Sequence, residues 1–216
     1  MKGRNSGQIS LYLLTLATAL YFPLIFSGAF RGAVDFWSLF AGGLMFFLIF
    51  ASAVDRFFSQ LIYFDFREKT LRALALGAVS AFLLYGFFFA GNFFLREIFP
   101  ASAEQLSSIY SLKNGSSQLR IGLFLGLIIG PGEELLWRGW LQRRWSGILG
   151  RTGGWLAVSL LYALVHLPGG NPVLALAALV CGMWWGFQYY RFNSLLANVI
   201  SHTLWDLMVF IFFPFA

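Results

Sequence analysis

Charged residues are scarce in this chain of 216 residues. Asp, Glu, Lys and Arg together make up 11% of it, against 59% hydrophobic and 19% aromatic residues. Soluble domains carry about a quarter charged residues and about half apolar ones, so this composition excludes a water-soluble globular domain. The expected solvent is a lipid bilayer, and several apolar spans of about 20 residues are predicted.

Cysteine is also nearly missing, which excludes two kinds of site. Cys181 is the single cysteine and lies within an apolar run, so neither an intrachain disulfide framework nor a cysteine-based metal site can form. Ser- or Pro-rich linkers and internal repeats are lacking as well. We therefore predict one integral membrane domain over residues 1–216.

An excess of positive charge is present, but it does not indicate a nucleic-acid-binding protein. The net charge is +6, from 15 Lys and Arg against 9 Asp and Glu. Lys and Arg accumulate on the cytoplasmic loops of membrane proteins, and the loops of this chain hold nearly all of them. We expect the lipid bilayer as a partner and no nucleic acid.

The apolar runs predict the fold class. This is an all-α polytopic membrane bundle of about seven transmembrane helices, with room for an eighth element. The first run is longer than the core of a signal peptide, about 7 to 15 residues, and is expected to remain as a helix. The connection at 55–70 is predicted to skim the headgroup layer, and 100–115 to form a short surface helix. The predicted spans are residues 9–30, 36–54, 71–95, 120–145, 154–168, 173–191 and 194–214.

Lys and Arg are divided unequally between the two sides of this predicted bundle. With the N-terminus inside, ten of them fall on the inner side and four on the outer side. Because positive residues prefer the inner side, we predict a cytoplasmic N-terminus. The inner residues are Lys2, Arg4, Arg56, Arg67, Lys69, Arg72, Arg143, Arg144, Arg151 and Arg191, and the outer ones are Arg31, Arg96, Lys113 and Arg120.

The few ionisable residues inside the spans fall into three short clusters. A charge at the centre of a bilayer costs about 2.5 to 3.5 kcal/mol on insertion scales, so these residues need partners or a water-filled cavity. Counted from the predicted helix ends at about 1.5 Å per residue, the clusters lie at similar depths and could share one cavity. They are Glu133 with Glu134 and Arg138, then His166, and then His202 with Asp206.

Spacing within the clusters suggests divided roles. Glu134 and Arg138 are four residues apart with the acid first, the favourable arrangement for an ion pair on a helix. The helical period turns Glu133 about 100° away from Glu134, so Glu133 can face a different neighbour, which suits a general base. His202 and Asp206 are also four residues apart, and Asp206 can therefore orient His202.

Each cluster also has a purely structural interpretation. The two glutamates and Arg138 could form an interhelical ion-pair network, and each histidine could be a hydrogen-bonded core residue. Three unrelated structural clusters would not be expected to gather at similar depth. Their joint occurrence favours a shared site.

The three clusters match, in order, the motifs of a known family. "EELLWR" (Glu133–Arg138) fits EExxxR, "YALVH" (Tyr162–His166) fits an aromatic-xxx-His motif, and "HTLWD" (His202–Asp206) fits HxxxN/D. EExxxR alone is a weak signal, whereas three motifs in order on a polytopic chain are a strong one. Over about residues 120–210 the chain resembles the CAAX prenyl endopeptidase and bacteriocin-processing, or abortive-infection-type, family of intramembrane proteases.

The resemblance implies peptide-bond hydrolysis in a helical cavity open to the cytoplasm. The expected partner is a peptide or protein substrate in or delivered to the membrane, and the resemblance to bacterial members suggests the bacterial inner membrane. Carried over by position, it implies that Glu133 and His166 activate a water. His202 and residue 206 would then stabilise the oxyanion, with Glu134 and Arg138 supporting the site.

Asp206 departs from the Asn that often ends the last motif. An ionised carboxylate cannot donate a hydrogen bond to an oxyanion and would oppose its charge. Asp206 is therefore expected either to be protonated or to hold His202 as the donor. We favour the second role.

Other functions stay open at this point. Glu133, His166 and His202 could hold zinc in a three-ligand site with an open position, although the divided roles of the two glutamates favour a reaction without metal or other cofactor. Buried acids and histidines also build the proton relays of transporters. An inert scaffold on the same fold is a further alternative. Neither the substrate nor the oligomeric state follows from these residues.

Overall fold

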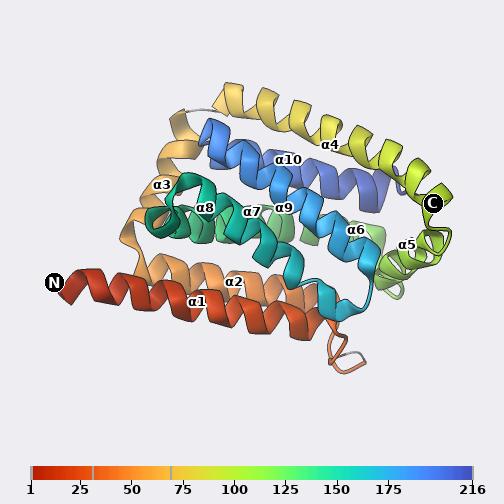
Figure 1. Cartoon of the computed structure of the whole chain (residues 1–216), viewed down its shortest axis with the longest axis horizontal. Coiled ribbons are helices and arrows are strands. Elements are labelled where there is room, and N and C mark those ends of the chain that lie inside the picture. The colour runs from red at the N-terminus through yellow and green to blue at the C-terminus, as the bar shows by residue number, and fades with distance from the viewer. Residues whose placement is uncertain (1, 31, 69, 216) are drawn as a thin grey trace.

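The chain forms a bundle of helices in a computed structural model (Figure 1). The structure describes the backbone of residues 2–30, 32–68 and 70–215, and the side chains of these residues apart from 2–6 and 68. All regular elements of this part of the chain are helical, which confirms the predicted all-α class. Four cations counted in predicting the orientation lie outside the described side chains, namely Lys2, Arg4, Arg31 and Lys69.

Ten α-helices and five shorter helical segments follow one another along the described part of the chain. The short segments η1 (Ser111–Lys113) and η4 (Leu167–Gly169) are 3₁₀ turns, whereas η2 (Leu125–Ile129), η3 (Leu135–Gln142) and η5 (Met208–Phe212) are π-helical. The α-helices are α1 (Lys2–Phe26), α2 (Phe36–Val54), α3 (Arg56–Glu68), α4 (Thr70–Ile98), α5 (Ser102–Tyr110), α6 (Gln118–Phe124), α7 (Gly130–Glu134), α8 (Arg143–Leu164), α9 (Pro172–Phe192) and α10 (Leu195–Leu207).

Six helical segments in the described chain are long and apolar enough to cross a membrane. The fourth, residues 118–169, contains two of the seven predicted spans. It is interrupted at Gly150, whose φ of 75° and ψ of 166° lie in a region open mainly to glycine. The chain folds back there, since the ring of Trp137 lies 5.1 Å from that of Tyr162. The six segments are thus compatible with about seven passes.

The long helices run roughly along one axis, so the bundle has two ends (Figure 1). At the first end, Arg144 donates a hydrogen bond to the carbonyl of Gly7, which brings the Gly150 turn beside the N-terminus. At the opposite end, the Trp37 indole donates to the carbonyl of Leu112 at 2.9 Å. We call these the N-terminal end and the far end. The helix α5 and the last described residues lie at the far end.

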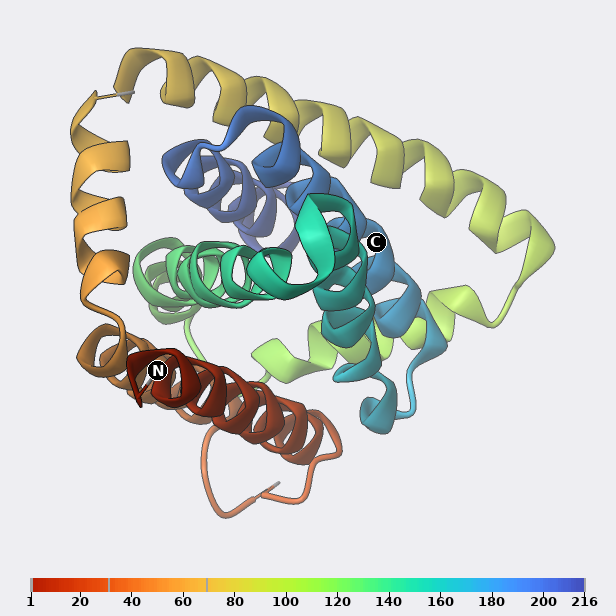
Figure 2. The ribbon, with the colours of Figure 1, turned by 60° about the vertical axis from the view of Figure 1, so that its left-hand side comes forward.

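The predicted surface segment at 55–70 forms α3, which crosses the N-terminal end at a steep angle to α1 and α4 (Figure 2). Its outward face is aromatic, with Phe57 73% and Phe64 53% exposed. At its start, the buried carboxylate of Asp55 accepts hydrogen bonds from Arg143 and Arg144. This ion-pair cluster joins α3 to the beginning of α8.

Small residues allow α10 to sit close to its neighbours. A Cβ added to Gly77 of α4 would lie 2.7 Å from the backbone oxygen of Ala197 in α10, so these two helices touch backbone to backbone there. Glycine at such crossings is typical of membrane helices. On the other side of α10, the Asn198 side chain reaches the Trp185 carbonyl of α9 at 2.7 Å. The polar face of α10 is therefore fixed between α7 and α9.

Candidate active site

The structure brings the six predicted site residues together in the middle of the bundle. None of them is more than 6% exposed. The two glutamates lie in α7, a short α-helical turn between two π-helical segments, and the arginine lies in the second of these segments, η3. One histidine follows the end of α8, and the other histidine and the aspartate lie in α10. π-Helical turns inside helices often occur at functional sites. The six residues are Glu133, Glu134, Arg138, His166, His202 and Asp206.

Glu134 is the centre of the hydrogen-bond network. Its Oε1 accepts a hydrogen bond from Arg138 Nη1 at 2.9 Å and lies 2.7 Å from His202 Nδ1. Its Oε2 accepts from Asn198 Nδ2 at 2.9 Å. The predicted ion pair of Glu134 with Arg138 is therefore confirmed. Because a carboxylate paired with Arg138 can only accept, Nδ1 of His202 carries its proton and Nε2 faces away from Glu134.

Glu133 points to a different neighbour, as the helical period predicts. Its Oε2 lies 3.6 Å from His202 Nε2, and its Oε1 accepts no hydrogen bond from the described residues. Asp206 Oδ2 lies 3.6 Å from the same nitrogen. These separations exceed a direct hydrogen bond and suit groups that share a water or a substrate oxygen.

His166 lies between α8 and η4, and a hydrogen bond from its Nδ1 fixes the ring. Nδ1 lies 2.6 Å from the carbonyl oxygen of Tyr162 and donates to it, since a carbonyl can only accept. The imidazole is held between two rings, with centroids 4.2 Å from that of Phe26 and 4.9 Å from that of Tyr162. Nε2 is left for the cavity that His166 lines together with Glu133 and His202.

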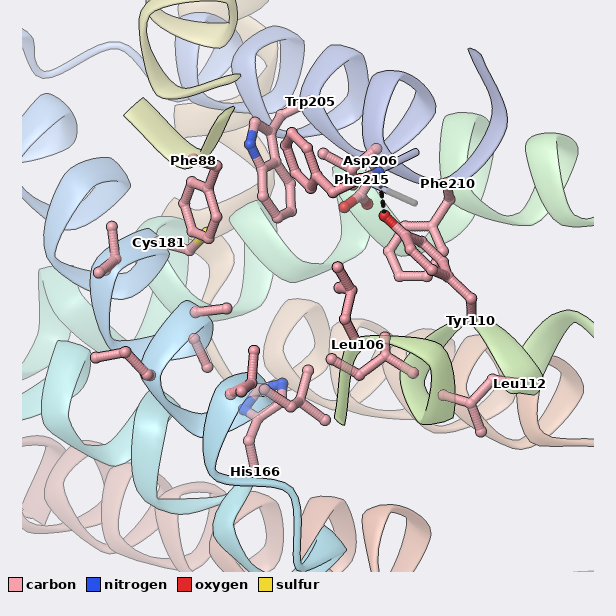
Figure 3. A pocket seen from close by; sticks show the side chains of 18 of the residues that line it. Phe88, Leu106, Tyr110, Leu112, His166, Cys181, Trp205, Asp206, Phe210 and Phe215 are labelled. Carbon is pink, nitrogen blue, oxygen red and sulfur yellow. Dashed lines mark hydrogen bonds between the residues drawn. The ribbon is translucent and has the colours of Figure 1, made fainter. Parts of the chain in front are cut away.

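A cavity of about 430 Å³ adjoins these groups. Its walls are mostly aromatic and aliphatic, and Figure 3 shows His166 and Asp206 on facing sides of it. Such a site, mostly apolar with a few convergent polar groups, is the usual form of a substrate pocket. The titratable side chains that line it include Glu133, Tyr162, His166, Cys181, His202 and Asp206.

The cavity lies toward the far end of the bundle. Its lining residues belong to the far-end halves of the helices, from Phe26 at the end of α1 to Leu174 near the start of α9 and Phe210 in η5. The predicted cytoplasmic N-terminus and the predicted opening of the cavity to the cytoplasm both stay predictions, because the side of the membrane that each end faces is not shown. The sequence gives the depth of each residue, but it does not show toward which end the helices diverge.

Two further residues belong to the site and were not predicted. Asn198, one turn before His202 on α10, donates to both Glu134 and the Trp185 carbonyl. The indole of Trp185 stacks on the His202 imidazole with centroids 3.7 Å apart and planes at 18°. Its Nε1 is held by Ser201 at 3.1 Å. The sequence signal for Asn198 is a neutral amide one helical turn before a histidine on an apolar helix. The prediction rested on ionisable residues, and an amide is not one.

The described side chains contain no group of three or more His, Cys, Asp or Glu arranged to hold a metal ion. Glu134 already accepts a hydrogen bond from Arg138. Nδ1 of His202 is hydrogen-bonded to Glu134, and Nδ1 of His166 is hydrogen-bonded to the Tyr162 carbonyl. Of the six predicted site residues, the two histidines, through Nε2, and the carboxylates of Glu133 and Asp206 are left to line the cavity. These groups suit acid–base work on a water and a peptide bond.

Comparison with known protein families supports the motif analysis. Residues 115–208 match a family model described as type II CAAX prenyl endopeptidase Rce1-like. The matched segment is less than half of the chain, but it carries all six predicted site residues. No curated protein and no solved structure matches the chain.

The matched family, the helices and the site agree on the kind of molecule. The family consists of endopeptidases, and the six long apolar segments are those of an integral membrane protein. The polar cluster lies within the matched segment and faces a cavity in the bundle. The protein is an integral membrane protease, similar over residues 115–208 to the Rce1-like type II CAAX prenyl endopeptidases.

Proposed function

We propose that the protein is a glutamate-dependent endopeptidase that hydrolyses a peptide bond of a membrane-associated substrate inside its helical cavity. The observation that carries this proposal is the unequal surroundings of the two adjacent glutamates. Glu134 is tied to Arg138, His202 and Asn198, whereas Oε1 of Glu133 accepts no hydrogen bond from the described residues and the side chain lines the cavity. One carboxylate supports the site and the other is available for a water.

In the proposed reaction, Glu133 removes a proton from a water that His166 Nε2 helps to position. The hydroxide adds to the carbonyl carbon of the substrate, and a tetrahedral intermediate with a negatively charged oxygen forms. Glu133 then returns the proton to the leaving amine as the C–N bond breaks. General acid–base catalysis by one carboxylate contributes about 10² to 10⁴-fold in rate.

His202 is proposed to stabilise the negatively charged oxygen. In its doubly protonated form it donates from Nε2 to the oxyanion while Nδ1 remains with Glu134, and such donors are worth about 3 to 4 kcal/mol. Asp206 lies 3.6 Å from Nε2. We assign it the predicted role of holding His202 rather than of a second donor, because an ionised carboxylate has no proton to give.

Substitution of Glu133 by Gln tests the proposal, because it preserves the shape of the side chain and removes its basicity. The E133Q protein, reconstituted in liposomes with quenched fluorescent apolar peptides, is expected to lose cleavage by at least about 100-fold and to unfold at the temperature of the wild type. The control is Glu104→Gln, an exposed carboxylate on α5, which should leave cleavage unchanged. Full activity of E133Q would end the proposal.

Chelation separates this reaction from the metal-dependent version. Because Glu133 and His166 act directly on water, cleavage should persist after treatment of the reconstituted protein with phenanthroline or EDTA. Loss of cleavage that zinc restores would favour the metalloprotease instead. The same liposomes, loaded with a pH-sensitive dye, would reveal the proton flux expected of a transporter.

A further inference from the structure

The last described residues lie against the active-site cavity. Residues 213–215 follow η5 and are not helical. Phe215 is only 9% exposed and lines the same cavity as Asp206, whereas Phe212 and Phe213 beside it are 62% and 60% exposed. Figure 3 shows Phe215 between Asp206 and Tyr110 of α5. The last described segment of the protein therefore forms part of the wall of the cavity at the far end.

Side chains from two other helices bind the backbone of this segment. The Tyr85 hydroxyl donates to the Phe213 carbonyl at 3.0 Å, and the Phe215 amide donates to the Tyr110 hydroxyl at 2.9 Å. The Phe215 carbonyl accepts from Arg96 Nη2 at 3.3 Å. Three side chains of α4 and α5 thus satisfy three backbone groups of an irregular peptide. Since their hydrogen bonds reach only backbone atoms, the same groups could bind the backbone of another peptide.

The side chain of Phe215 enters an aromatic pocket. Its ring stacks on Tyr85 with centroids 5.1 Å apart and planes at 25°. Phe88 and Trp205 line the same cavity, and their rings pack on one another at 5.0 Å. This pocket fits a large apolar side chain. Backbone hydrogen bonds combined with a pocket for one side chain are the usual way in which a protein holds an extended peptide.

We propose that Tyr85, Arg96 and Tyr110 form a backbone-binding subsite for an extended apolar peptide with a large side chain, and that residues 213–215 hold this subsite in the present structure. The substrate takes their place when it binds. This inference rests on the proposed protease function, because it assigns part of the substrate to a position next to the catalytic cavity. Lys113 holds the preceding turn by donating to the Phe210 carbonyl at 3.0 Å, so only the segment beyond that turn has to move.

Competition between the segment and the substrate has a measurable consequence. When a ligand can bind only after another group has left, its apparent affinity is its intrinsic affinity multiplied by the fraction of open molecules. Removing the Phe215 ring takes away the stacking on Tyr85 and the filling of the pocket. The open fraction therefore rises, and an added peptide should bind more tightly.

The experiment measures binding in the E133Q protein, where the probe is not consumed. The probe is a fluorescently labelled peptide of sequence Phe-Phe-Pro-Phe, and binding to the protein in nanodiscs is followed by anisotropy. Phe215→Ala is expected to lower Kd by about fivefold. The matched control is Phe212→Ala, an aromatic residue at the end of η5 that is 62% exposed, which should leave Kd unchanged within about twofold.

A second variant tests the subsite itself. In the F215A protein, Tyr110→Phe keeps the ring and removes the hydroxyl that accepts the peptide amide. Kd for the probe should then rise by about threefold or more. If F215A does not fold, Phe215→Leu keeps an apolar side chain without the stacking on Tyr85 and should shift Kd in the same direction by a smaller factor.

Two outcomes would overturn the inference. F215A could bind the probe no more tightly than F212A while its unfolding temperature falls, which would make residues 213–215 a structural closure of the bundle. Alternatively, Y110F could have no effect in the F215A protein. Both readouts are independent of cleavage, so retention of activity by E133Q would contradict the proposed function and leave the binding result intact.

Discussion

At the residue scale, the proposed chemistry depends on the unequal surroundings of two adjacent glutamates. Glu134 is surrounded by a guanidinium, an imidazole and an amide, and all of its neighbours are buried. The carboxylate thereby fixes His202 through Nδ1 and directs Nε2 toward Glu133 and Asp206. A charge in the membrane interior is tolerated because its partners are complete.

Asn198 is expected to act as a positioning residue, because it holds Glu134 and the Trp185 carbonyl at once. Asn198→Ala should lower kcat by about 10-fold or more with a small change in KM, since a loosened Glu134 no longer fixes His202, and should displace the pH profile of kcat. Losing a buried hydrogen-bond donor should also cost about 1 to 3 kcal/mol of stability.

The matched control for Asn198 is Gln142→Ala. Gln142 is equally buried and donates to the Gly186 carbonyl at 2.9 Å, but it does not touch the acidic pair. Its loss should lower the unfolding temperature without altering the pH profile of kcat. Identical pH profiles for N198A and the wild type would show that Asn198 serves packing alone.

The sequence was informative about ionisable residues and less so about their supports. Glu133, Glu134 and Arg138 could be recognised because charge is rare and unfavourable in an apolar helix, and the ion pair follows from a spacing of four. Asn198 and Trp185 could not be recognised in this way. Amides and indoles are ordinary in membrane helices, and their importance arises only when α9 is packed against α10.

At the element scale, the junction between α2, α3 and α8 depends on one carboxylate. Burial would raise the pKa of Asp55, but the hydrogen bonds and positive charges of Arg143 and Arg144 outweigh it and hold the pKa below its usual value. Asp55 therefore stabilises the fold above the unfolded-state pKa of about 4. That contribution is lost as the pH falls through the lower folded-state value.

Asp55→Asn is expected to lower the free energy of unfolding at pH 7 by roughly 1 to 3 kcal/mol, because two guanidinium groups lose their anion. It should also flatten the loss of stability between about pH 5 and pH 2. Thermal unfolding in detergent across this range measures both effects. Asp35→Asn is the control, since its pair with Arg120 is 35–40% exposed and such pairs contribute about 1 kcal/mol or less.

If the D55N protein lost stability at low pH as steeply as the wild type, other carboxylates would control the stability in acid.

The junction also illustrates what spacing can and cannot predict. The amphipathic pattern at 55–70 predicts a surface helix, and α3 is found there. The reversal at Gly150 joins two predicted spans into one continuous helical segment, because a single glycine with positive φ suffices for the turn and no polar loop is needed.

At the scale of the whole molecule, most of the described cations lie at the end of the bundle opposite the cavity. Described side chains at the N-terminal end include seven Arg, against Arg96, Lys113 and Arg120 at the far end. The cavity is lined from the far-end halves of the helices. If the positive end is cytoplasmic, the cavity faces the outer side of the membrane. The seven are Arg56, Arg67, Arg72, Arg143, Arg144, Arg151 and Arg191.

Cysteine labelling can decide the orientation, because Cys181 is buried and should not react. Ser108→Cys places a thiol on the exposed surface of α5 at the far end, and Gly147→Cys places one at the N-terminal end, where no atom lies within 4 Å of an added Cβ. With a membrane-impermeant maleimide, S108C should be labelled in intact cells and G147C only in inverted vesicles. The opposite pattern would put the cavity on the cytoplasmic side. It would mean that the arginines at the N-terminal end serve the packing of α3 and α8, as Arg143 and Arg144 do at Asp55, and do not determine the topology.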